Sequence, residues 1–294
     1  MCVKPAATTA PANPDNGAQA ITHYENFPVA SWLCPPRLRP PIAAIYHFAR
    51  TADDLADEGE APANERLQAL ADYRSDLHRT LAGQAPGPRW AGVLQALARQ
   101  QQAWQLPVPL LDDLLSAFEQ DVAFTRDARS YADRAALLDY CRRSANPVGR
   151  LLLHLHGVDD AQALAQSDAI CSALQLINFW QDLSQDIPRG RHYLCDADLQ
   201  AHGVGRQVLQ ALQPTPAALA LINAQLDWAE ALMRQGAPLV HRLPGRAGWE
   251  LRLVVQGGWR IIERIRAVGG NSLQHRPKLG RADAPGLFWR CLWM

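Results

Sequence analysis

Hydrophobic residues recur at helical spacing along most of the 294-residue chain, and strand-like alternation is nearly absent. No internal repeat is visible, which argues against a solenoid. We therefore expect one all-α domain over residues 21–276, preceded by a flexible tail, residues 1–20. Residues 277–294 would form a C-terminal tail able to fold as a short amphipathic helix. The pattern predicts helices near residues 38–58, 63–82, 90–102, 108–122, 131–157, 160–185, 215–236 and 246–268.

Two of the expected helices, residues 135–157 and 161–180, are apolar on most sides, which predicts that both are buried. Small residues interrupt them, among them Gly149 and Ser172. Such residues either let helices approach closely or leave space for a lined cavity, and the pattern leaves both readings open. Pro147 lacks a backbone N–H, so we expect it to bend the first of the two.

Charge and composition narrow the classes of function. The chain has 29 Lys and Arg against 29 Asp and Glu, so it lacks the basic excess typical of nucleic-acid binders. Its six cysteines form no C-x-x-C pair, which indicates reduced thiols in a cytoplasmic protein. The sequence contains no run of about 18 apolar residues, so no membrane-spanning helix is expected.

The first acidic cluster lies near the end of the predicted helix 38–58. Asp53 and Asp57 are four residues apart and project from the same face. Like charges at this spacing destabilise a helix by a few tenths of a kcal/mol, which favours a counter-charge nearby. Taken alone, the cluster is more typical of a solvated acidic face.

The second cluster ends a predicted buried helix. Asn178, Asp182 and Asp186 follow one another at intervals of four, so a continuous helix would present them as one polar ridge. A carboxylate on a buried helix is costly to desolvate unless it is paired or binds a metal.

Two carboxylate-bearing helices that face each other could hold a diphosphate through Mg²⁺, because this ion takes carboxylate and phosphate oxygens together. Arg50 and Arg191 lie close to the two clusters in sequence, and guanidinium groups match phosphate oxygens. The chemistry this predicts is loss of pyrophosphate to give a carbocation, in an apolar cavity that excludes water.

Three motifs in order carry a family resemblance that spans about residues 23–276. They are Tyr46-x-x-x-Arg50-x-x-Asp53-Asp54-x-x-Asp57, Tyr140-Cys141 leading to Val148-Gly149, and Gln175-x-x-Asn178-x-x-x-Asp182-x-x-x-Asp186. The chain resembles the squalene and phytoene synthase family. This resemblance implies the isoprenoid synthase fold, a single-domain helical bundle around a central apolar cavity.

The same resemblance implies roles for individual residues. Asp53, Asp57, Asp182 and Asp186 would be the catalytic carboxylates and, with Asn178, the ligands of Mg²⁺. Tyr140 would lie near the reacting carbons, where its ring could stabilise a cation or its hydroxyl could position water; a core tyrosine is the alternative. Substrate contacts would come from Tyr46, Arg50, Gln175, Asn178, Arg191 and Arg276.

Further segments resemble the bacterial hydroxysqualene synthase branch: residues 23–28, 141–150, 178–182 and 254–259. This implies a substrate, presqualene diphosphate, that is ionised, rearranged and trapped by water without NADPH, and a functional link to a presqualene diphosphate synthase. Glu25, Gln181 and Gln185 stand where many condensing members carry Lys, Arg and Glu, which fits an enzyme that holds one diphosphate.

Two other classes of function stay open at this point. One is a squalene or phytoene synthase that condenses two prenyl diphosphates; the other is an inactive helical scaffold, which intact aspartate pairs argue against. Residues 286–294 are rich in aromatic side chains. They would cap the core or contact a membrane peripherally, at its inner face, because tryptophan favours the headgroup region.

Overall fold

The computed structural model describes residues 34–294 of the chain. Within this range the regular structure is helical, with one isolated bridge between Ser130 and His192 in place of any sheet. The expected tail, residues 1–20, and the segment with Glu25 lie outside the described residues. The all-α fold that the sequence predicts is confirmed.

Eight regions of predicted helix correspond to the long helices of the structure. Short 3₁₀ turns connect some of them. In chain order the helices are α1 (Arg39–Asp57), α2 (Ala63–Leu81), α3 (Ala91–Trp104), α4 (Val108–Arg126), α5 (Arg134–Ser144), α6 (Asn146–Leu155), α7 (Ala161–Gln181), α8 (Leu183–Asp186), α9 (Asp196–Ala201), α10 (Arg206–Gln210), α11 (Pro216–Gly236), α12 (Arg246–Ala267) and α13 (Ala284–Leu292).

The expected bend at Pro147 is a full break. The predicted helix 131–157 is divided into α5 and α6 at Ala145, two residues before the proline, where φ is −118° and ψ is −47°. Pro147 has no N–H to donate back into α5, so it is accommodated in the first turn of a new helix. The break lets α5, which carries Tyr140, take its own direction.

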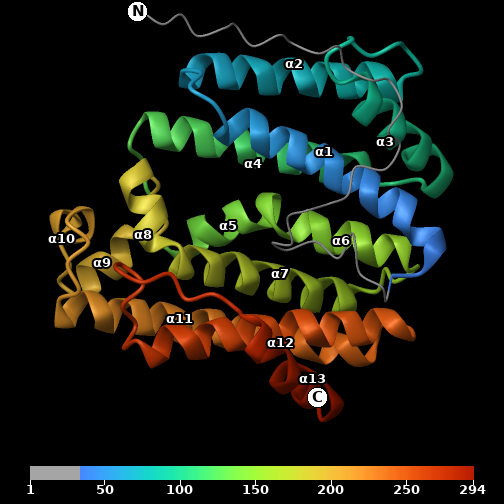
Figure 1. The fold of residues 1–294 in the computed structure, drawn as a ribbon. Helices are drawn as coiled ribbons and strands as arrows, with labels where there is room; N and C mark the ends of the chain where they lie inside the picture. Colours follow the sequence, from blue (N-terminus) through green and yellow to red (C-terminus); the bar gives the residue numbers. More distant parts are fainter. Residues whose placement is uncertain (1–33) are drawn as a thin grey trace, which may run out of the picture.

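The helices are arranged in layers around α7, which lies in the middle of the molecule (Figure 1). Helices α1 to α4 lie on one side, α11 and α12 on the other, and α13 beneath α12 at the edge. Two apolar clusters match this division: one is built around α1 to α4, and the other joins α7 to α11 and α12. α7 is therefore buried from several sides, as its apolar sequence predicts.

α7 and α11 approach closely at Gly236. A Cβ built on Gly236 would lie 2.5 Å from the carbonyl oxygen of Gln166 and 2.9 Å from the backbone nitrogen of Ile170. Backbone atoms cannot swing aside, so Gly236→Ala should destabilise the fold by roughly 1–3 kcal/mol in urea unfolding. Gly92→Ala is the matched control, because a Cβ there meets nothing within 4 Å and alanine improves a helix. Equal stability of the two variants would contradict the prediction.

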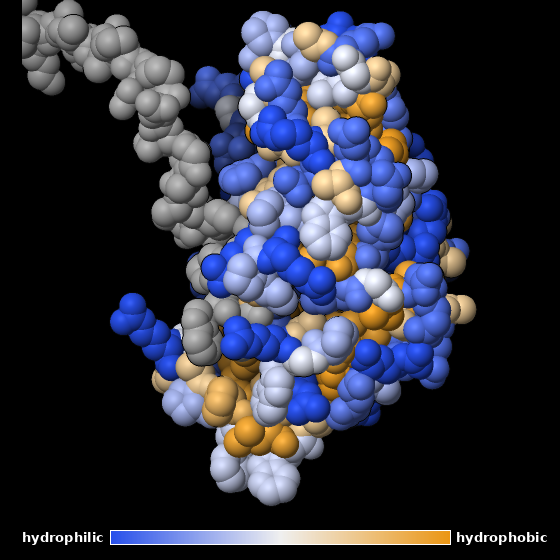
Figure 2. Space-filling model, turned by 90° about the vertical axis from the view of Figure 1, so that its right-hand side faces the viewer, coloured by the Kyte–Doolittle hydropathy of each residue, from blue (hydrophilic) through white to orange (hydrophobic). Residues whose placement is uncertain are grey.

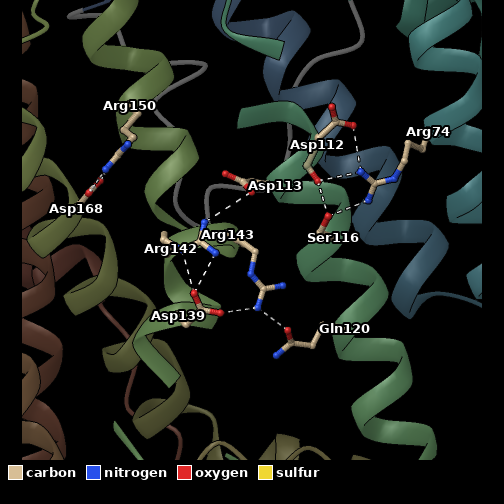
Figure 3. A network of polar contacts seen from close by, with 10 residues as sticks. All are labelled: Arg74, Asp112, Asp113, Ser116, Gln120, Asp139, Arg142, Arg143, Arg150 and Asp168. Carbon is tan, nitrogen blue, oxygen red and sulfur yellow. Dashed lines mark hydrogen bonds and ion pairs between the residues drawn. The ribbon is translucent and has the colours of Figure 1, made fainter. Parts of the chain in front are cut away.

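Two arginines of the segment 141–150, Arg143 and Arg150, join neighbouring helices (Figure 3). Arg143 donates to Gln120 on α4 at 2.6 Å, and Arg150 forms a 2.6 Å ion pair with Asp168 on α7. These contacts fix α5 against α4 and α6 against α7. The motif therefore has a structural part, which holds the helix that bears Tyr140.

Two smaller expectations from composition can be compared with the structure. The five cysteines of the described range are free thiols, four of them buried. None of the helices described here has both the length and the apolar character that a bilayer crossing requires.

Candidate active site

The first aspartate motif occupies the last turns of α1. Arg50 forms ion pairs with Asp53 at 2.9 Å, Asp54 at 2.7 Å and Glu58 at 2.6 Å. This arginine supplies the counter-charge that the i, i+4 aspartates require. Asp57 lies one turn beyond Asp53 and turns to a different partner.

The second motif does not form the continuous ridge that its spacing predicts. α7 ends at Gln181, and Asp182, with φ −101° and ψ 12°, separates it from the single turn of α8 that contains Asp186. Asp182 accepts two hydrogen bonds from Arg276, at 2.5 and 2.8 Å. Arg276 comes from the segment after α12, so a part of the chain 94 residues away reaches this carboxylate.

Arg191 connects the two motifs. Its guanidinium forms an ion pair with Asp57 on α1 and lies 3.8 Å from Asp186 on α8. Gly190, at φ +78°, makes the turn that brings Arg191 back toward α8, whose Asp186 carbonyl accepts the backbone N–H of Arg191 at 3.0 Å. The two aspartate-bearing segments predicted from sequence thus lie together, linked by the Arg191 guanidinium.

A half-buried carboxylate that the sequence analysis did not select completes the site. The Tyr140 hydroxyl on α5 donates a 2.5 Å hydrogen bond to Asp121 on α4. The charges of Arg191, Asp57 and Asp186 all act on Asp121, which places it beside the two motifs. A signal was present: Asp121 follows Leu114 and Phe118 at helical spacing, so it replaces an apolar residue in the inward stripe of α4.

Four aromatic rings pack beside this carboxylate. Tyr193 stacks on Phe179 with ring centroids 3.6 Å apart, and Tyr140 lies 5.6 Å from Tyr131 and 6.1 Å from Phe179. Tyr131 and Tyr193, with Asp121 and Arg191, also line a pocket. Carboxylates, arginines and an aromatic wall thus lie within one region, and aromatic faces are able to attract cations.

Burial and like charges alter the acidity of these carboxyl groups. Burial, and then the neighbouring Asp57, raise the pKa of Asp53 to about 6. Burial is also the main cause that raises the pKa of Asp186 to about 6 and that of Asp121 to about 7. Such crowding of carboxylates is typical of functional sites, and a bound cation would relieve it.

These shifts predict a pH dependence of stability. Because the folded-state pKa of Asp121 lies above that of an unfolded aspartate, the folded protein is favoured at low pH and loses this contribution as pH rises from about 4 to about 7. His156 and His192, whose pKa values burial lowers, titrate in the opposite sense. The melting temperature of Asp121→Asn, measured in EDTA, should therefore gain on wild type between pH 5 and pH 8. A constant difference would contradict the assignment.

The remaining predicted residues lie on α1 and α7, the helices that carry the two motifs. Tyr46 is one turn before Arg50 on α1 and packs on His47, with ring centroids 5.5 Å apart. Gln175 and Asn178 are half-buried on α7, the latter one turn before Asp182. No side-chain hydrogen bond joins either amide to the two aspartate motifs in the described structure, so their place in the site stays a prediction.

The donor chemistry fits a hard divalent cation. Asp53, Asp57, Asp182 and Asp186 offer carboxylate oxygens, the ligands that Mg²⁺ prefers, and burial, with a smaller contribution from neighbouring carboxylates, raises the pKa of Asp53 and Asp186. Within residues 34–294 no three acidic, histidine or cysteine side chains already converge on one metal position. Here Arg191 and Arg276 neutralise the carboxylates instead.

Comparison with known proteins identifies the family of this chain. Residues 21–283 match the family model described as squalene/phytoene synthase. A hydroxysqualene synthase of Rhodopseudomonas palustris is 34% identical over 82% of this chain and 80% of its own. A presqualene diphosphate synthase of Zymomonas mobilis is 27% identical over 99% and 96%.

Solved structures agree with the sequence comparisons. The crystal structure of squalene synthase HpnC from Alicyclobacillus acidocaldarius superposes with a TM-score of 0.74 at 36% identity, over 84% of this chain and 90% of that one. The fold is the all-α isoprenoid synthase fold, as the resemblance implied. With its aspartate motifs intact and brought together, the chain is an enzyme that belongs to the squalene/phytoene synthase family.

Proposed function

We propose that this enzyme converts presqualene diphosphate to hydroxysqualene. The bond between carbon and the diphosphate oxygen breaks, the resulting cation rearranges, and water adds to it with loss of a proton. The observation that carries the proposal is the contact of both aspartate motifs with Arg191, beside an aromatic wall. The greater identity to a hydroxysqualene synthase than to a presqualene diphosphate synthase supports this substrate.

The arginines would exchange partners when the substrate binds. Arg50, Arg191 and Arg276 now neutralise carboxylates, and each could turn to diphosphate oxygens once the carboxylates bind metal. Bound to Asp53, Asp57, Asp182 and Asp186, with Asn178 beside them, Mg²⁺ would neutralise the charge of the leaving diphosphate. Tyr46 and Gln175 would contact the substrate. The wall of Tyr140 and its neighbours would stabilise the cation and limit the entry of water.

Gln181 supports an enzyme that holds one diphosphate. Its buried amide donates to the carbonyl of Pro277 at 2.7 Å, which ties down the segment that carries Arg276. This residue therefore has a structural partner and adds no charge where many condensing family members place an arginine. We propose that the reaction needs no NADPH and that a presqualene diphosphate synthase supplies the substrate.

The test is product analysis. Purified protein is incubated with presqualene diphosphate and Mg²⁺ without NADPH, and the lipid product is identified by mass spectrometry. A C30 alcohol is the expected product. A C30 hydrocarbon formed from farnesyl diphosphate when NADPH is supplied, or a C40 hydrocarbon formed from geranylgeranyl diphosphate, with no alcohol from presqualene diphosphate, would replace the proposal by the condensing alternative.

A further inference from the structure

α13 exposes an unusual amount of aromatic surface. Phe288, Trp289 and Trp293 are 61%, 62% and 77% exposed, and Leu292 beside them is 47% exposed. The rings of Trp289 and Trp293 contact edge to face, with centroids 5.9 Å apart. We call these four residues the α13 patch. Their spacing places them along one face of the helix, and Figure 2 shows pale and orange side chains at the foot of the molecule, where α13 lies in Figure 1.

The opposite face of α13 is firmly attached to α12. Cys291 is buried, and its carbonyl accepts a hydrogen bond from Arg252 at 3.1 Å. Arg290 forms a 2.6 Å ion pair with Glu263. These contacts fix the rotation of the helix, so the aromatic face points outward. The opposite face covers α12, and Met294 packs against the core, which agrees in part with the core-capping reading of the sequence.

Basic residues outnumber acidic ones in the segment that leads to and includes α13, although the chain as a whole is neutral; Arg242, Arg266 and Arg276 pair with acids outside this segment. Residues 242–294 contain ten Lys and Arg but only three Asp and Glu. Among these acids Asp283, just before α13, is 5% exposed and is bound by Arg260 and Arg264. Lys278 and Arg281, in contrast, are exposed next to the helix.

We propose that the α13 patch binds the surface of an anionic lipid bilayer, with its tryptophans at the level of the headgroups and the rest of the protein outside. Tryptophan favours this interface, and stable peripheral binding combines an inserted apolar face with basic residues that attract anionic lipids. α13 lies well away from α8 and its carboxylates (Figure 1). The inference therefore stands independently of the proposed reaction.

Sedimentation with vesicles tests the proposal. The full chain should bind vesicles of phosphatidylcholine with phosphatidylglycerol and bind pure phosphatidylcholine weakly. The double variant Trp289→Ala/Trp293→Ala should lower the partition coefficient about tenfold or more. Lys278→Glu/Arg281→Glu should weaken binding to the anionic vesicles alone, whereas Arg99→Glu, an exposed arginine on α3, should leave it unchanged. Melting temperatures confirm that each variant is folded.

Other results would overturn the proposal. Vesicle binding that the tryptophan variant leaves unchanged would assign attachment to another surface. A dimer in sedimentation velocity that the same variant dissociates, without vesicle binding, would show that a second copy covers the α13 patch. Turnover of detergent-dispersed presqualene diphosphate should be the same in wild type and variant, so failure of membrane binding is distinguishable from failure of the proposed reaction.

Discussion

Asp53→Asn and Asp182→Asn should each reduce turnover of presqualene diphosphate by about 10²-fold or more, because each removes a full charge from the groups proposed to bind metal and stabilise the leaving diphosphate. The two residues come from different helices, α1 and the junction of α7 with α8. Loss of activity in both variants would show that the two motifs act together. Steady-state kinetics at saturating and at limiting Mg²⁺ provides the measurement.

A second readout separates metal binding from general damage to the site. In wild type, Mg²⁺ should raise the melting temperature at pH 7.5, since a ligand that binds only the folded state stabilises it. Either substitution should reduce this shift. Asp227→Asn is the matched control, because Asp227 is 72% exposed and pairs with Arg266. A full Mg²⁺ shift in an inactive Asp53→Asn protein would assign that residue a role other than metal binding.

The local part of the site follows from sequence because it depends on helix periodicity alone. Asp53 and Asp57 share one face of α1, and Arg50 reaches the first of them from one turn earlier. The contact of Arg191 with Asp57 joins residues 134 positions apart. Nothing in the spacing of either segment sets that distance; it arises from how α1 packs relative to the turn after α8.

Most differences between the helices predicted from sequence and those of the structure occur at short elements and at helix ends. α9 and α10 contain six and five residues, too few for a periodic pattern to emerge. The end of α7 at Gln181 could not be read from residues 178–186, whose spacing is that of a continuous helix. Pro147 marked its break because proline acts on the backbone directly.

Asp121 shows what a periodic pattern alone overlooks. Its position in the stripe of α4 is visible in sequence, but one acidic residue in such a stripe is also found at exposed edges of helices. Only the packing of α5 against α4 brings the Tyr140 hydroxyl to it. Because burying a carboxylate is costly without a partner, the Asp121–Tyr140 pair is the feature that most changes the picture of the site.

Tyr140→Phe should lower turnover of presqualene diphosphate by about 10²-fold, the scale of a lost polar contact in a catalytic site. The substitution keeps the aromatic ring among Tyr131, Phe179 and Tyr193. It removes the hydroxyl whose hydrogen bond to Asp121 lowers the pKa of that carboxyl in the wild type. The pKa of Asp121 should rise, and the pH at which activity is half-maximal should move upward with it.

Tyr73→Phe is the matched control, because Tyr73 is also fully buried and its hydroxyl donates to the Phe48 carbonyl at 3.3 Å in the other apolar cluster. Both substitutions should cost stability by about 0.5–1.5 kcal/mol, the net value of a typical hydrogen bond, but only Tyr140→Phe should change turnover and its pH profile. Equal turnover in the two variants would make Tyr140 a core residue. A tenfold or greater difference, with the ring retained in both, would assign the effect to the hydroxyl that faces Asp121.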